Sequence, residues 1–247
     1  MRPLFRLLLL TLICNAPVAR AADIREDMVA LDRAVIPVLV LSSEGQAVLA
    51  FKAMRVARSK WTTFKERHFQ TNAKDADWKK DLDRVDALMW EAYTIIDGGR
   101  QVALAQEPLE RVNVIMASLR QRNRINHYFD HLTAFRQPLN ALVGAAQAKV
   151  PAEDAVSRIR TSFATAKEAW ERVVSAEPGT GYQLTSGERE ALQAKVDLET
   201  AALAALGKAL DASDRAAIIA AAAATSPPFV GIYTSFGDFH GLIWEGS

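Results

Sequence analysis

Residues 47–68, AVLAFKAMRVARSKWTTFKERH, contain the clearest helical pattern in the chain. Apolar or aromatic side chains recur there every three or four residues, and the strict alternation of a half-buried strand is absent. The series consists of Ala47, Ala50, Met54, Ala57, Trp61 and Phe64, and His68 continues it. A stripe of this kind predicts an amphipathic helix with one face in a hydrophobic core.

The same periodicity recurs on both sides of this segment, in stripes at residues 24–38, 78–96, 109–119, 156–173 and 192–210. Pro37 and the sequence SSEG that follows predict a kink or break near residues 37–45. The helix that begins near Pro108 is expected to continue to about Val150. Thr185 and Glu188 form a capping-box pattern that marks the start of a later helix.

Long amphipathic helices joined by short loops favour antiparallel neighbours. We therefore expect an all-α protein, an antiparallel helical bundle of four to five long helices, in a single domain at residues 22–247. No internal repeat stands out. The C-terminal residues 227–247 are rich in aromatic side chains, and we expect this segment to form an aromatic cap packed on the bundle. The aromatic residues are Phe229, Tyr233, Phe236, Phe239 and Trp244.

The N-terminal residues 1–21 are typical of a secretory signal peptide. Two arginines flank the start of an apolar run, Leu7 to Ile13, and small residues precede a cleavage position after Ala21. The run is too short to cross a bilayer. Ala216–Ala224 is the longest apolar run later in the chain, and it is also too short, so no membrane span is expected. These features predict a periplasmic or secreted protein, cleaved near Ala21.

Cysteine and charge content narrow the classes of function. The only cysteine, Cys14, lies inside the leader, so the mature chain has none. Disulfides, thiolate metal sites, thiol catalysis and covalent haem attachment are thereby excluded. The leader also contains Arg2, Arg6 and Arg20 of the 30 basic residues, which face 29 acidic ones, so the mature chain is close to neutral. This balance gives no reason to expect nucleic acid as a partner.

Half of the four histidines lie in residues 123–135, NRINHYFDHLTAF. On a continuous helix, His127 and His131 would lie one turn apart, in the arrangement of two nitrogen ligands of a metal ion. If the chain reverses near residues 73 and 107, His68 lies in the same half of the bundle, beside a run of aspartates. The predicted ligands, for zinc, copper or iron, are His68, His127, His131, Asp83, Asp86 and Asp130.

A cationic stripe is a second interpretation of the same segment. It consists of Arg120, Arg124, His127 and His131, at spacings of four, three and four residues. A continuous helix would present all four on one face, where they could bind a carboxylate or phosphate. The estimated heights also place Asp83 and Asp86 opposite the two histidines. A third interpretation is therefore a seam of salt bridges between helices, which contributes little stability when exposed.

The sequence contains no GxSxG, HExxH or Gly-rich phosphate-binding motif, so no enzymatic activity is predicted. We expect a non-enzymatic exported protein that holds a metal ion or small anion in a polar seam between helices. The alternative is a periplasmic accessory or chaperone-like protein that binds a partner through a bundle face and the aromatic tail. Non-covalent haem binding through histidine and Met54, Met89 or Met116 is a further alternative, although methionine in an apolar stripe usually fills the core.

Overall fold

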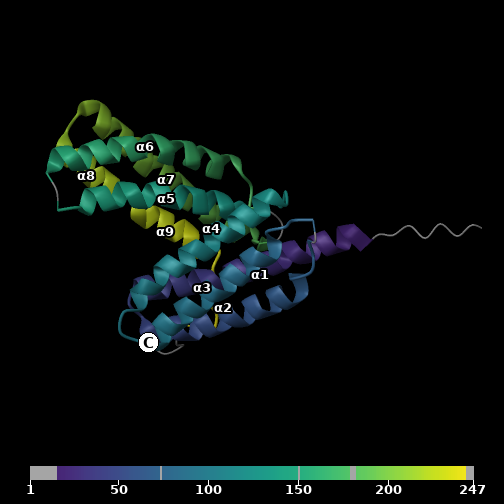
Figure 1. Ribbon diagram of the computed structural model, residues 1–247. Helices are drawn as coiled ribbons and strands as arrows, with labels where there is room; N and C mark the ends of the chain where they lie inside the picture. The colour runs from purple at the N-terminus through teal and green to yellow at the C-terminus, as the bar shows by residue number, and fades with distance from the viewer. Residues whose placement is uncertain (1–15, 73, 150, 179–181, 243–247) are drawn as a thin grey trace, which may run out of the picture.

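The computed structural model describes residues 16–242 apart from residues 73, 150 and 179–181, and it is helical throughout that part of the chain (Figure 1). No strand occurs among these residues, which confirms the predicted all-α class. The helices are α1 (Ala16–Ser43), α2 (Ala47–His68), α3 (Trp78–Asp97), the 3-10 helix η1 (Val102–Ala105), α4 (Gln106–Arg122), α5 (Tyr128–Gln147), α6 (Ala152–Ser175), α7 (Ser186–Ala212), α8 (Arg215–Ala224) and α9 (Ser226–Thr234). The helices α1–α7 are each 17 to 28 residues long, so there are more long helices than the four to five expected.

The helices form two halves with the same order of elements. Figure 1 shows α1–α3 in the lower part of the view and α5–α9 in the upper part, with α4 leading from one to the other. In each half the first helix packs along the second, α1 on α2 and α5 on α6, and the third packs on the last, α3 on α4 and α7 on α8 and α9. The first helix of each half also contains one internal proline, Pro37 or Pro138. The two halves of the described chain therefore pair their helices in the same order, with α8 and α9 together in the place that α4 takes in the first half, a correspondence that the sequence analysis did not find.

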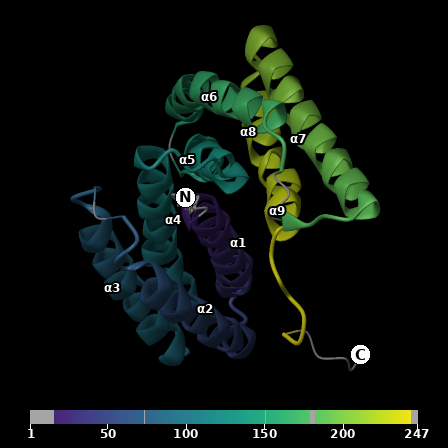
Figure 2. The same ribbon diagram turned by 90° about the vertical axis from the view of Figure 1, so that its right-hand side faces the viewer.

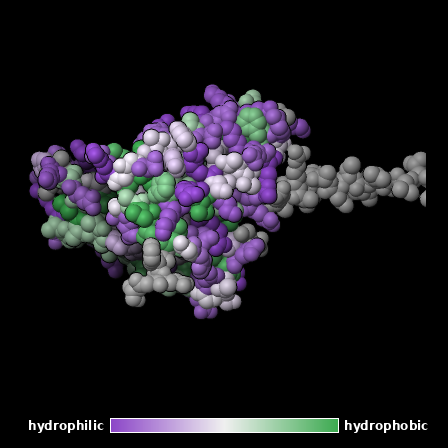
Figure 3. Space-filling view, turned by 90° about the horizontal axis from the view of Figure 1, so that it is seen from below, coloured by the Kyte–Doolittle hydropathy of each residue, from purple (hydrophilic) through white to green (hydrophobic). Residues whose placement is uncertain are grey.

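Apolar packing is continuous between the halves. The buried side chains of both belong to one hydrophobic cluster, and α1 and α4 of the first half contact α9 and α5 of the second. On the face seen in Figure 3, hydrophilic side chains predominate and hydrophobic ones gather in small patches. Most large apolar side chains are thus used inside the molecule, as expected for a bundle with amphipathic helices.

The prediction of one long helix from Pro108 to Val150 is wrong. α4 ends at Arg122 and α5 begins at Tyr128, and Arg124 between them has a φ of 55°. The side-chain amide of Asn123 donates a hydrogen bond of 2.7 Å to the carbonyl oxygen of Leu119, which ends α4 locally. His127 consequently lies before α5 in an extended conformation, with φ −148° and ψ 120°.

The first helix continues through Pro37 and ends at Ser43, so the interruption predicted near residues 37–45 falls at the end of that range. Residues 1–15, which make up most of the expected signal peptide, lie outside the described residues. α1 begins at Ala16 and thus overlaps the end of the expected leader. Cleavage near Ala21 and export stay predictions.

The C-terminal aromatic side chains pack on the helices as predicted. The ring centroid of Phe229 lies 5.2 Å from that of Phe135 on α5. The ring centroid of Tyr233 lies 4.8 Å from that of Phe129 on the same helix. After α9 the chain runs beside α1 (Figure 2), where the backbone N–H of Asp238 donates to the Arg33 carbonyl oxygen at 2.8 Å. Trp244, the last of the predicted aromatic residues, lies outside the described residues.

Helices α8 and α9 together form the one segment of the described chain, Arg215–Thr234, that is long and apolar enough to cross a membrane. The sequence analysis missed it because Ala216–Ala224 alone is too short. A core helix of a water-soluble protein meets the same criteria of length and composition. Here Ile218 and Ile232 are fully buried against the other helices, although only 33% of the apolar window is buried inside the protein.

Candidate functional site

A cluster of buried polar and charged side chains lies where the two halves meet. Its members, which we call the junction cluster, are Asp32 of α1, Arg120 of α4, His127 before α5, Asp130 of α5 and Tyr182 in the segment before α7. Four of the five are exposed by less than a tenth, Asp32 by 5%, Arg120 by 1%, His127 by 8% and Tyr182 by 3%. Charged side chains are buried to this extent only when they are paired.

Hydrogen bonds and ion pairs connect all five residues. The Arg120 Nε donates to both carboxylate oxygens of Asp130, at 2.9 and 3.1 Å, and its Nη1 lies 4.0 Å from Asp32 Oδ1. The other Asp32 oxygen contacts His127 Nε2 and accepts a hydrogen bond of 3.4 Å from the Tyr182 hydroxyl. That hydroxyl also lies 3.2 Å from His127 Nε2. The junction cluster therefore holds one arginine between two carboxylates, with a histidine on one of them.

The electrostatic environment keeps two of these groups in one protonation state. Burial favours a lower pKa for Arg120, but the charges of Asp32 and Asp130 outweigh it and raise this pKa above its ordinary value. Burial, together with the Asp32 charge, raises the pKa of the Tyr182 hydroxyl well above 10.0. Arg120 is thus always a cation and Tyr182 always a hydrogen-bond donor, so the cluster is arranged before any ligand arrives.

The predicted cationic stripe does not exist as one helix face. The break at residues 123–127 leaves Arg124 exposed, and His131 lies half-buried on α5. Arg120 and His127 do come together, but in the junction cluster, where Asp130 and Asp32 bind them. The stripe prediction thus contained two members of the junction cluster, and the metal-ligand prediction contained Asp130, but both assumed a helix that the structure interrupts.

The other predicted metal ligands lie apart from the junction cluster. His68 is buried at the end of α2, where its Nε2 lies 2.7 Å from Asp27 Oδ2 of α1. Asp83 and Asp86 each lie 3.0 Å from Lys65 Nζ, so they face α2 and not the histidines. Within the described residues, no group of three or more His, Cys, Asp or Glu side chains is placed to hold one metal ion.

A cavity of about 470 Å³ between α4 and α5, which we call the junction cavity, adjoins the cluster. His127 and Asp130 form part of its wall, and His131 also lines it. Most of its other polar lining consists of Ser118, Gln121, Asn126, Thr133 and Gln137. The Thr133 hydroxyl is buried and has no hydrogen-bond partner in the described part of the protein. Buried polar groups normally have partners, so this hydroxyl indicates room for a water or a ligand.

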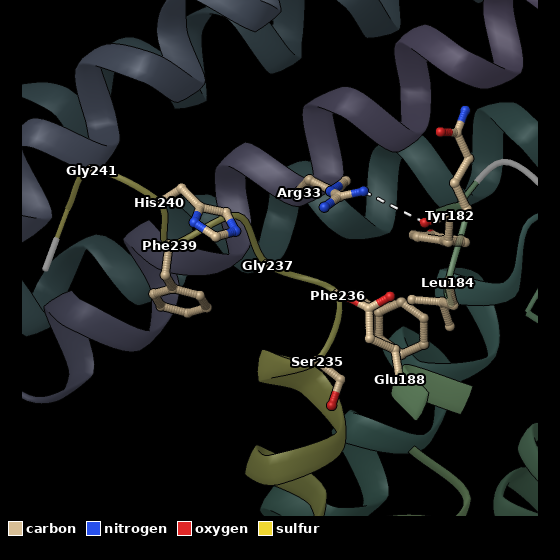
Figure 4. A pocket seen from close by; sticks show the side chains of 11 residues that line it. Arg33, Tyr182, Leu184, Glu188, Ser235, Phe236, Gly237, Phe239, His240 and Gly241 are labelled. Atoms are coloured by element: carbon tan, nitrogen blue, oxygen red, sulfur yellow. Dashed lines mark hydrogen bonds between the residues drawn. The ribbon is translucent and has the colours of Figure 1, made fainter. Parts of the chain in front are cut away.

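A second cavity, of about 460 Å³, lies under the C-terminal segment, and we call it the tail cavity (Figure 4). Tyr182 lines it as well as belonging to the junction cluster, so the two sites share a side chain. Arg33 of α1 and Glu188 of α7 also line this cavity, with Phe236, Phe239 and His240 of the C-terminal segment. The site region thus combines a fixed charged centre with two cavities of a size usual for small-molecule sites.

Sequence reasoning missed Asp32 and Tyr182. Asp32 carried a usable signal, because it lies one helical turn from both Met28 and Ile36, within the apolar stripe of residues 24–38. Such a position predicts a buried charge that needs a partner. Tyr182 gave no signal, since it lies within a stretch, residues 177–183, whose sequence is typical of a loop and has no periodicity. Comparison with known proteins found no match to this chain among family models, curated proteins or solved structures.

Proposed function

We propose that this chain is a non-enzymatic exported binding protein that holds a small anion in the junction cavity. The single observation that carries the proposal is the Thr133 hydroxyl, buried beside the cavity without a partner among the described residues. A bound oxyanion would accept the hydrogen bond that this hydroxyl otherwise lacks. Export rests on the signal-peptide pattern, and the absence of catalytic motifs supports a binding role.

The other groups around the cavity favour an anion over a cation. The amides of Gln121, Asn126 and Gln137 and the ring of His131 are able to donate hydrogen bonds. The cavity also lies at the N-terminus of α5, a 20-residue helix whose N-cap residue makes no side-chain cap bond. The first N–H groups of such a helix attract anions. Asp130 opposes this effect, and Arg120, which it shares with Asp32, offsets its charge in part.

A bound metal ion is the second candidate function. It is favoured by one observation, that His127, His131 and Asp130 of the predicted ligand set line the same cavity. Their present placement does not form a three-ligand group in the described chain. A metal ion would therefore require these side chains to move, whereas an anion uses donors already on the wall.

The remaining expectations receive less support. Phe229, Tyr233 and Phe236 of the aromatic tail are buried, so their rings are not available to a partner protein. Met54, Met89 and Met116, the predicted axial ligands of a haem, are buried in the hydrophobic core. An absorption spectrum of the purified protein tests the haem alternative directly.

The anion site is tested by thermal unfolding of the mature chain with phosphate, sulfate, zinc, copper(II) or iron(II). A ligand that binds only the native state raises the melting temperature in a concentration-dependent way. We expect this shift with phosphate or sulfate, and we expect Thr133→Val and His131→Ala to reduce it. Arg124→Gln is the matched control, because Arg124 is a nearby exposed cation that does not line the cavity.

Two outcomes overturn the anion assignment. If no anion shifts the melting temperature, the junction cavity holds no anion. If only a metal ion does so, and His131→Ala abolishes the effect, the site is a metal site.

A further inference from the structure

We propose that the tail cavity binds a small zwitterion that carries an apolar or aromatic group, such as a free α-amino acid. This site is separate from the anion site proposed above, because it has a different cavity and different donors. The elements that form it are α1, the segment before α7, the first turn of α7 and the chain after α9 (Figure 4).

Two opposite charges, Arg33 and Glu188, line the tail cavity, and the Arg33 charge helps to lower the pKa of Glu188. Both side chains belong to the described part of the chain, and no ion pair joins them there. The Arg33 Nη1 donates to the Tyr182 carbonyl oxygen at 3.5 Å, and this is the one side-chain hydrogen bond of Arg33 within the described residues. A guanidinium has five N–H donors, so most of them are available to a ligand carboxylate.

Glu188 is also held in position, and one of its two carboxylate oxygens is available to a ligand. Its Oε2 accepts hydrogen bonds from the Thr185 N–H at 2.7 Å and from the Thr185 hydroxyl at 2.8 Å, as part of the capping box of α7. These bonds lower the pKa of Glu188, so it is a carboxylate at neutral pH. The Oε1 makes no hydrogen bond within the described chain and is available to a ligand ammonium.

Aromatic rings form much of the remaining wall. Tyr182 and Phe236 are buried and meet edge to face, with ring centroids 4.9 Å apart, and Phe239 and His240 lie further along the same segment. Such a wall suits an apolar or aromatic group, and ring faces also attract an ammonium group. The lining therefore matches all three parts of an amino acid with an apolar side chain.

The chain after α9 is fixed in position, so this wall is part of the folded structure. A Cβ atom at Gly237 would lie 2.6 Å from Phe239 Cε2 and 2.8 Å from Ile36 Cγ2, so only glycine lets the segment pass this close to α1. The Asp238 N–H then donates to the Arg33 carbonyl oxygen at 2.8 Å. These contacts hold Phe236 and Phe239 on either side of the close approach.

A ligand with only one charge fits this cavity less well. An anion that approaches Arg33 also meets the Glu188 carboxylate, and a cation that approaches Glu188 meets the guanidinium. A zwitterion places each of its charges beside the opposite one, so both contacts are favourable. This arrangement gives selectivity by repulsion as well as by attraction.

The test is calorimetric titration of the full chain with L-phenylalanine. Three comparison compounds lack one part each: 3-phenylpropanoate lacks the ammonium, 2-phenylethylamine lacks the carboxylate, and glycine lacks the apolar group. We expect L-phenylalanine to bind at least about tenfold more tightly than each of them, because each loses one set of contacts.

Arg33→Gln and Glu188→Gln are each expected to weaken L-phenylalanine binding by at least about tenfold. Glutamine at position 188 keeps a side chain suited to the capping box, so the second variant tests the charge and not the fold. The matched controls are Arg25→Gln on α1 and Glu190→Gln on α7, both exposed positions that do not line the cavity, and they are expected to bind as the natural chain does.

Equal binding of 3-phenylpropanoate and L-phenylalanine would show an anion site and overturn the zwitterion assignment. Absence of heat with every compound would overturn the site itself. Thr133→Val, which alters the junction cavity, is expected to leave L-phenylalanine binding unchanged. Failure of either proposal is thus distinguishable from failure of the other.

Discussion

Asp32 in the junction cluster and Glu199 of α7 are two of the buried carboxyl groups in the described part of this protein, and they are accommodated in different ways. Asp32 is 5% exposed and contacts the side chains of His127, Tyr182 and Arg120. Glu199 is 0% exposed, and neither of its oxygens makes a hydrogen bond of normal geometry within the described chain.

The difference shows two ways to bury an acid. At the junction, partners that donate hydrogen bonds or carry positive charge stabilise the carboxylate. On α7, burial raises the pKa of Glu199 to about 8. The Phe229 backbone lowers this pKa, but by less than burial raises it. The group is therefore accommodated as a neutral acid. The first arrangement joins α1, α4 and α5 through fixed charges, whereas the second makes the packing of the second half sensitive to pH.

The largest expected effect follows from removal of the one arginine in the junction cluster. Arg120→Met leaves Asp32 and Asp130 buried or half-buried without their cation, and breaking a buried pair in this way costs about 3–5 kcal/mol. Urea unfolding at neutral pH measures the loss. Arg111→Met is the control, because Arg111 forms an exposed pair with Glu107 that is worth at most about 0.5 kcal/mol. A loss below about 1 kcal/mol for Arg120→Met would show that the cluster does not hold the halves together.

The next effect concerns Glu199 and depends on pH. The folded-state pKa of about 8 lies above the ordinary value of 4.5, so the native protein binds the proton more tightly than the unfolded chain. The free energy of unfolding should therefore fall between about pH 4.5 and pH 8, by up to about 1.4 kcal/mol per pH unit.

Glu199→Gln removes this titration and is expected to be more stable than the natural chain at pH 8 and similar to it near pH 4.5. Urea unfolding of both proteins over this pH range gives the comparison. Asp197→Asn, an exposed change two residues away on α7, serves as the control and should leave the pH profile unaltered. Parallel profiles for the natural chain and Glu199→Gln would show that Glu199 has a partner or reaches solvent.

The smallest effect concerns the Tyr182 hydroxyl, which contributes one donor to the cluster. Tyr182→Phe keeps the ring but removes the bonds of 3.4 Å to Asp32 and 3.2 Å to His127, at an expected cost of about 1–2 kcal/mol. Tyr93→Phe is the matched control, since Tyr93 is half-buried and its hydroxyl makes no hydrogen bond in the described residues. If both variants are equally stable, the Tyr182 hydroxyl adds no measurable stability, and the charged groups alone stabilise the cluster.

The site was only partly predictable. Arg120, His127 and Asp130 were identified because basic, histidine and acidic residues gather in that stretch, yet the predicted geometry assumed a continuous helix. The apolar series has a gap between Leu119 and Ile125, but Ile125, Phe129 and Leu132 resume it at intervals of four and three residues, so the break was not recognised. The break depends on Asn123, whose amide binds the Leu119 carbonyl and also donates to Asp75 in the turn before α3. A contact with a distant segment is not visible in local periodicity.

The sequence by itself determined that this protein is helical and that its C-terminal aromatic side chains pack on the helices. The first follows from the spacing of apolar side chains along one chain segment, which acts over a few residues. The second follows from the aromatic content of residues 227–247. Only the tertiary structure decided which charges meet, because Asp32, Arg120 and Tyr182 are separated by tens of residues and come together only when α1, α4 and the segment before α7 have packed. The same holds for the two cavities, whose walls come from different elements and exist only after those elements are in contact.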